Sequence, residues 1–119
     1  MKKHEDIAGN PIKEGDYVLY AALWSRSATL KYGRVIKLTM AKSPDWRGES
    51  PPKVQVVTVD RGWDDKWEIQ GGGWENKDPE KAKLVTLGFV DRMMVVTKAQ
   101  IPEDARKLLD AAYKVKSDA

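Results

Sequence analysis

The 119-residue chain lacks cysteine and has a single histidine. Without cysteine it can form no disulfide, supply no thiolate nucleophile and offer no sulfur ligand to a metal. Cysteine-free chains suit a reducing compartment, so we expect a cytoplasmic protein. The one histidine, His4, lies in a polar amino-terminal segment that we expect to be flexible. Because Ser-His-Asp and Cys-His centres need a positioned imidazole, we predict that the protein is not an enzyme.

Long apolar runs are also absent from the sequence. No segment approaches the ~20 apolar residues of a membrane-spanning helix, and Lys2 and Lys3 are not followed by the apolar stretch of a signal peptide. We therefore expect neither a membrane protein nor a secreted one. The hydrophobic fraction of 41% and the charged fraction of 33% are typical of a folded chain. The length is that of one domain, which we expect to cover residues 1–119.

Charge is distributed unevenly along the chain. The net charge is +3, but residues 1–59 carry +4, residues 60–80 carry −4 and residues 81–119 carry +3. Basic segments attract phosphate and acidic ones repel it. A nucleic-acid surface is therefore expected in the flanks, whereas the acidic middle suits a protein partner.

Six segments have the β-branched and aromatic composition of short strands. They are residues 17–22, 29–39, 53–60, 63–69, 82–88 and 91–97. Gly33 lies inside the second segment, where glycine indicates a β-bulge. In the third segment Val54, Val56 (or Val57) and Val59 predict a strand with one buried face.

The carboxyl end has helix signals instead. Pro102 stands at a helix start, Glu103 and Asp104 lie in the first turn, and Lys114 and Lys116 lie near the end, as the helix dipole favours. The apolar residues of this segment share one face, which consists of Ala105, Leu108, Leu109, Ala112 and Val115.

These elements together predict a mainly β fold. We expect a small antiparallel β-barrel of five to six strands over residues 12–98, with a C-terminal α-helix over residues 101–116. The helix is expected to cap an open end of the barrel, and residues 1–11 are expected to be flexible.

The hairpin formed by GDYVLY and KYGRVIKL resembles the first hairpin of SH3-like barrels, including the KOW type. The matching residues are Gly15, Asp16, Val18, Gly33 and Val35. The leader IAGNPIKEGDYVLYA and the helix start Pro102–Asp104 are also similar to those of small tailed-phage proteins. The resemblance implies an SH3-like barrel and a phage protein in the host cytoplasm. SH3-like domains are generally binding modules, and KOW-type members often bind RNA, ribosomes or RNA polymerase.

The stretch DRGWDDKWEIQGGGWE combines tryptophans, acids and a triple glycine. Trp63 and Trp67 share one face of the expected strand and are predicted to be core residues. Adjacent acids such as Asp64 and Asp65 point to opposite faces of a strand, so a solvated face explains them better than a metal site. The glycines lack Walker or dinucleotide-loop spacing and are predicted to form a loop. We expect no metal and no cofactor.

The basic flank suggests one binding surface. Residues 26–53 hold seven bases and two acids, and aromatic residues lie among the bases. Lysine and arginine neutralise phosphates and aromatic rings stack on bases, which together make a single-strand-binding surface. The candidate residues for RNA or DNA are Trp24, Arg26, Lys31, Tyr32, Arg34, Lys37, Lys42, Trp46, Arg47 and Lys53. The competing interpretation is that the lysines only keep an exposed strand soluble.

The loop tryptophans suggest another surface. Trp46 and Trp74 lie in segments rich in proline and glycine, where an exposed indole indicates a contact. Trp46, Trp74 and Glu75 are the candidates for binding a host or phage protein. Our first interpretation is therefore a phage-type accessory module that binds a protein, and the alternative is a nucleic-acid-binding barrel. Exposed aromatics on a basic face would favour the alternative.

Overall fold

The structure, a computed structural model, describes residues 4–24, 27–44, 46, 48, 50–61, 67–69, 80, 82–88 and 90–117. Within these residues the chain forms six strands and one α-helix. The strands are β1 (Tyr17–Trp24), β2 (Ser27–Met40), β3 (Pro52–Arg61), β4 (Trp67–Ile69), β5 (Val85–Leu87) and β6 (Met93–Val96). The 3-10 turns η2 (Val90–Arg92) and η3 (Lys98–Gln100) flank β6, and helix α1 (Glu103–Ser117) follows.

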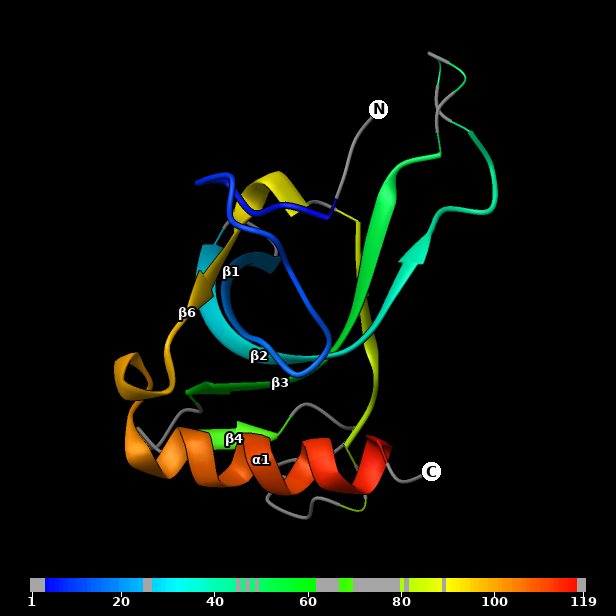
Figure 1. Ribbon diagram of the computed structural model, residues 1–119. Coiled ribbons are helices and arrows are strands. Elements are labelled where there is room, and N and C mark those ends of the chain that lie inside the picture. The colour runs from blue at the N-terminus through cyan, green and yellow to red at the C-terminus, as the bar shows by residue number, and fades with distance from the viewer. Residues whose placement is uncertain are drawn as a thin grey trace.

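The strands form one antiparallel sheet with the order β4-β3-β2-β1-β6, and β5 also pairs with β3. β4 and β5 pair with different parts of β3, at residues 59–61 and 54–56. Figure 1 shows β1 and β2 curling around the amino-terminal segment. The expected mainly antiparallel fold with a C-terminal helix is confirmed. In the described part of the chain the pairing ends at β6 on one side and at β4 and β5 on the other, so it describes a curled sheet.

The sheet has an apolar cluster on each face. One face is crossed by residues 4–16, and we call it the strap face. On this face Val18, Val35 and Val56 pack with Ile12 of the amino-terminal segment. On the opposite face, the helix face, Val57 and Val59 pack with buried residues of α1, namely Ala105, Leu109 and Ala112. The prediction of one buried face for β3 is therefore wrong. The helix covers the second face, a tertiary contact that alternation along a single strand does not reveal.

The expected bulge in β2 occurs, but not at Gly33. Gly33 pairs regularly with Val18 and Thr58, and the register of β2 against β3 shifts between Val35 and Lys37. Gly33 lies in close packing, because an added Cβ would lie 3.4 Å from the Tyr20 ring and 3.2 Å from a backbone oxygen and would need these neighbours to move by a few tenths of an ångström. The Tyr20 ring reaches across β2, and its hydroxyl donates to Thr58 Oγ1 at 2.7 Å.

Helix α1 lies along the helix face, below β3 and β4 in Figure 1. It packs against β2, β3 and β4, rather than capping an open end of a barrel as the sequence suggested. The reason is its apolar stripe, which finds a matching surface in the valines that β3 presents on this side. The first turn carries Glu103 and Asp104 and the last turn carries Lys114 and Lys116, as predicted.

Residues 4–16 form a strap across the strap face (Figure 1). The Asp6 carboxylate accepts hydrogen bonds from the backbone N–H groups of Ala8, Asn10 and Val95, at 3.0, 2.8 and 2.8 Å. Ile7 N–H donates to the Met93 carbonyl at 2.9 Å. The segment that we expected to be flexible is thus hydrogen-bonded to β6 over the part of it that the structure describes.

Candidate nucleic-acid interface

The structure divides the basic span into residues that serve the fold and residues that face solvent. Arg26 and Arg47 lie outside the described residues, as does the side chain of Trp24. The remaining members belong to β2, β3 and the loop between these strands. They fall into two groups on either side of the bulge.

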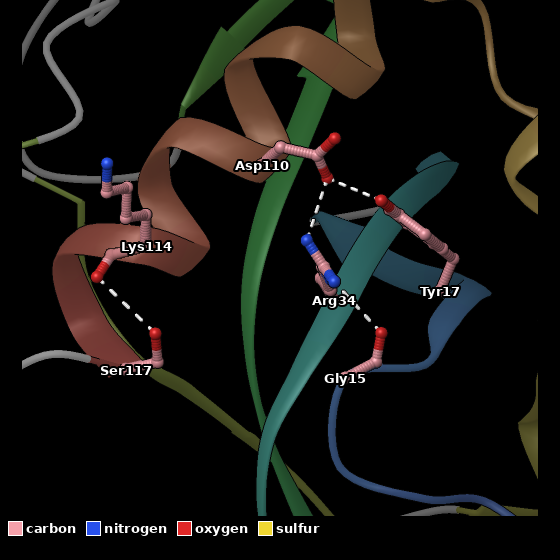
Figure 2. A network of polar contacts seen from close by, with 6 residues as sticks. All are labelled: Gly15, Tyr17, Arg34, Asp110, Lys114 and Ser117. Atoms are coloured by element: carbon pink, nitrogen blue, oxygen red, sulfur yellow. Dashed lines mark hydrogen bonds and ion pairs between the residues drawn. The ribbon is translucent and has the colours of Figure 1, made fainter.

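Arg34 belongs to the first group and is the centre of a polar network that joins β1, β2 and α1 (Figure 2). Its Nη1 lies 3.0 Å from Asp110 Oδ1, and its Nε donates to the Gly15 carbonyl at 3.0 Å. Gly15 has φ +90°, which favours glycine over other residues in this turn. The Arg34 guanidinium also lies over the rings of Tyr17 and Tyr113, at 4.8 and 3.9 Å from their centroids.

The Tyr17 hydroxyl completes this network by donating to Asp110 Oδ1 at 2.6 Å. Burial raises the pKa of the Tyr17 phenol, and the hydrogen bond to Asp110 raises it further. Arg34 therefore fastens the helix to the sheet. We remove it from the predicted nucleic-acid surface, because its charge and its planar face are already engaged within the protein.

Lys31 and Tyr32 are engaged in a similar way. Lys31 Nζ lies 3.7 Å from Asp60 Oδ2. The Tyr32 ring packs against Trp67, with centroids 5.7 Å apart and planes at 53°. Both rings pack against the cluster on the helix face, in line with the prediction that Trp67 is a core residue. Neither Lys31 nor Tyr32 is presented to a ligand in the way that the sequence suggested.

The bulge changes which lysines share a face. Lys37 pairs with Gln55, and Thr39 pairs with Lys53. Gln55 is two residues from Val57, so Lys37 lies on the same side of the sheet as Arg34 and not on that of Lys31. A bulge at Gly33 would also have shifted the register. The observed bulge lies later, between Val35 and Lys37, and leaves Lys31 on the strap face.

Beyond the bulge, β2 and β3 continue as a two-stranded arm. We define the arm as residues 37–55, which comprise the end of β2, the loop after it and the start of β3. Figure 1 shows the arm running away from the curled part of the sheet. Lys37 and Lys42 are exposed and Lys53 is half-buried. None of these three lysines takes part in an ion pair among the described residues.

The arm carries a hollow of about 520 Å³ on the side of Lys53. It is lined by Thr39, Met40, Ala41, Lys42, Ser43, Lys53, Gln55 and Thr86. These residues supply two ammonium groups, three hydroxyls and an amide, and no carboxylate is among them. Hydroxyl, amide and ammonium groups all donate hydrogen bonds to phosphate oxygens. The hollow is therefore chemically suited to an anion.

Trp46 lies in the loop of the arm and is 90% exposed, the largest value among the exposed large hydrophobic residues that the structure describes. Met40, next to the hollow, is 45% exposed. Removing an indole from water is favourable, so a ligand that covers the exposed part of this ring gains apolar contact. Of the predicted stacking residues, Trp46 is the one that the structure describes as exposed.

A second hollow, of about 390 Å³, lies at the other end of β2. Leu19, Leu30, Tyr32 and Trp67 line it together with Thr29, Asp60 and Arg61. Its apolar character and the Asp60 carboxylate make it a poor phosphate site. The predicted protein-binding residues Trp74 and Glu75, and Trp63 with them, lie outside the described residues.

The titratable groups do not form a metal site within the described residues, where no group of three or more His, Asp or Glu side chains could hold an ion. No helix of the described chain has the length and apolarity needed to cross a membrane. No family model, curated protein or solved structure matches this chain.

Several residues that line the hollow were not identified from the sequence. These are polar residues of common types, and they become candidate ligand contacts only because the fold places them beside the lysines. They are Thr39, Ser43, Gln55 and Thr86. Thr86 comes from β5, which pairs with Gln55 of β3. Strict alternation along β2 would place Lys37 on the side of Lys31, and it fails because the position of the bulge is set by pairing with β3.

Proposed function

We propose that the protein is a non-enzymatic binding module whose arm binds single-stranded nucleic acid. The observation that carries the proposal is the 90% exposed Trp46 in a loop whose flanking strands bear lysines without carboxylate partners among the described residues. This is the arrangement of exposed aromatic and basic residues that favours nucleic acid over a protein partner.

The lysines and the tryptophan have separate tasks in this proposal. Lys42 and Lys53 hold a backbone phosphate at the hollow, with hydroxyls as additional donors. Lys37, on the same side of the sheet, extends the positive track along the strand. Trp46 stacks on a base, which contributes about 1–3 kcal/mol in comparable single-strand binders. Neither task reads the base edges, so the expected sequence preference is weak.

A single strand fits the arm better than a duplex. The bases of a duplex are stacked on one another, so an indole cannot cover a base face without unstacking the helix. An unpaired base offers its face at no such cost. The resemblance of the Gly15–Val18 and Gly33–Val35 segments to KOW-type hairpins supports RNA as the ligand. The resemblance of the leader IAGNPIKEGDYVLYA and of the Pro102–Asp104 helix start to small tailed-phage proteins supports the cytoplasm of a phage-infected host as the location.

Fluorescence anisotropy with a labelled 15-nucleotide single strand tests the proposal, and the same sequence as a duplex is the competitor. We expect micromolar or tighter binding at low salt, with the single strand preferred. Trp46→Ala should weaken binding by about 5- to 100-fold. Leu30→Ala, which removes another exposed apolar side chain far from the arm along β2, is the matched control and should leave the affinity unchanged.

Absence of binding at low salt would overturn the proposal. A protein partner that uses the same Trp46 is then the remaining interpretation. It is tested by a pull-down from a bacterial lysate treated with nuclease, comparing the wild-type protein with the Trp46→Ala variant. A partner that survives nuclease and is lost with Trp46 would identify a protein-binding module.

A further inference from the structure

His4, at the start of the described chain, contacts the base of the arm. Its Nε2 lies 2.8 Å from the Thr39 carbonyl oxygen and 3.2 Å from that of Lys53. A carbonyl oxygen can only accept, so the imidazole N–H donates to both oxygens in a forked hydrogen bond. Thr39 and Lys53 face each other across β2 and β3, and both line the hollow of the arm. One side chain thus holds both strands of the arm where the hollow begins.

The strap gives His4 a fixed position on the body of the protein. The Asp6 carboxylate and the Ile7 N–H attach the strap to β6. Ile12 is 3% exposed in the cluster of the strap face, and its N–H donates to the His4 carbonyl at 2.9 Å. The imidazole is therefore tied to the sheet by the strap residues that follow it in the chain.

Among the residues that the structure describes, the arm has little other support at this point. Beyond the pair Thr39 and Lys53 the strand register continues only to Met40 and Pro52, and Ala41 N–H donates to Pro51 at 2.8 Å. β5 pairs with residues 54–56 of β3 and does not extend to Lys53. A two-stranded ribbon on its own is marginally stable in water. Each contact that ties its base to the body therefore has a large influence on its order.

We propose that His4 is a positioning residue of the arm, which fixes the carbonyls of Thr39 and Lys53 and so sets the shape of the hollow. The effect on ligand affinity rests on the proposed function, whereas the effect on the order of the arm does not. The imidazole touches the backbone of the site and leaves the ligand to Lys42, Lys53 and Trp46.

Amide hydrogen exchange on His4→Ala and His4→Gln variants tests the proposal. In His4→Ala we expect exchange at residues 37–41 and 53–55 to become about fivefold faster, because one forked hydrogen bond is lost. Exchange at Val57, Val59 and the buried part of α1 should not change. His4→Gln retains an N–H donor of similar reach and should recover most of the protection. Glu5→Gln, at an exposed neighbouring position, is the control for changes in the strap itself.

The same variants are then titrated with the labelled single strand. We expect the affinity of His4→Ala to fall two- to fivefold and that of His4→Gln to return toward the wild-type value. Unchanged arm exchange in His4→Ala, or equal acceleration throughout the protein, would overturn the positioning role. Faster arm exchange with no oligonucleotide binding by the wild-type protein would uphold the role of His4 and remove the proposed function instead.

Discussion

The basic residues on the two sides of the β2 bulge lie in opposite surroundings. Before the bulge, Arg34 Nη1 lies 3.0 Å from an Asp110 oxygen and Lys31 Nζ lies 3.7 Å from Asp60. After it, Lys37 and the two lysines of the hollow have no ion pair among the described residues. The chemistry of the side chains is alike, and the difference lies in what the fold places beside them. Formal charge along a sequence therefore overstates the charge that a ligand can meet.

The largest expected difference between the two regions is in the loss of stability when Arg34 or Lys37 is replaced by alanine. Arg34→Ala should lower the free energy of unfolding by about 3 kcal/mol, since it removes an ion pair, a hydrogen bond to Gly15 and contacts with two rings. Lys37→Ala should leave the urea midpoint unchanged. Equal effects of the two substitutions on the midpoint would contradict the division of β2 into a structural and a ligand-facing part.

The Asp6 anchor of the strap should have the next largest effect. Burial raises the pKa of the Asp6 carboxyl, but the backbone N–H groups of Val95, Asn10 and Ala8 outweigh it and hold the pKa below 3.8. A lowered folded-state pKa means that the stabilisation is complete above the unfolded-state value and is lost as pH falls through the folded-state value. Asp6→Asn should cost about 2 kcal/mol at pH 7.

Urea unfolding at pH 7 and at a pH below 3.8 checks this. The difference between wild type and Asp6→Asn should shrink at the lower pH, where the wild-type carboxylate becomes protonated. Glu5→Gln supplies the control for a lost acidic charge on the strap. A difference that stays constant with pH would show that the carboxylate charge does not hold the strap.

Tyr17→Phe is expected to have a smaller effect. Removal of the hydroxyl loses the 2.6 Å bond to Asp110 and should cost about 1 kcal/mol. The pKa of Tyr17 is raised by burial and then by Asp110, so this stabilisation is present below the ordinary value of 10.0 and is lost as pH rises through the folded-state pKa. The wild-type advantage over Tyr17→Phe should therefore decrease in alkaline solution. A stable advantage there would indicate that the hydroxyl bond is not part of the network.

Much of the fold could be predicted because local pattern and final structure agree. The β-branched and aromatic composition of β1 and β3, and the acids and lysines at the two ends of α1, all describe short-range physics. The second buried face of β3 could not be predicted. Valines of β3 point to both sides of the sheet, and those on the helix face are buried because they pack against α1. The position of α1 on the sheet is set by the same tertiary contact.

The candidate site was predictable in part. Trp46 was identified as a candidate because its loop is rich in proline and glycine, and Lys42 and Lys53 were identified from charge. The exposure of Trp46 itself could not be predicted. Arg34 was assigned to the ligand, because its partner Asp110 is 76 positions away along the chain. The contact of His4 with the arm could not be predicted for the same reason, since its acceptors are 35 and 49 positions away. Long-range polar contacts leave no periodic signal in a sequence.

The salt dependence of single-strand binding tests the central claim most directly. If Lys37, Lys42 and Lys53 each neutralise a phosphate, the logarithm of the binding constant should fall with the logarithm of salt concentration with a slope of roughly −2. The triple substitution of these lysines by alanine should bring the slope close to zero. Lys98→Ala, at an exposed position in η3, should leave the slope at the wild-type value. A triple variant that keeps the wild-type slope, or a wild-type protein that binds no single strand at low salt, would contradict the assignment of the arm as a nucleic-acid interface.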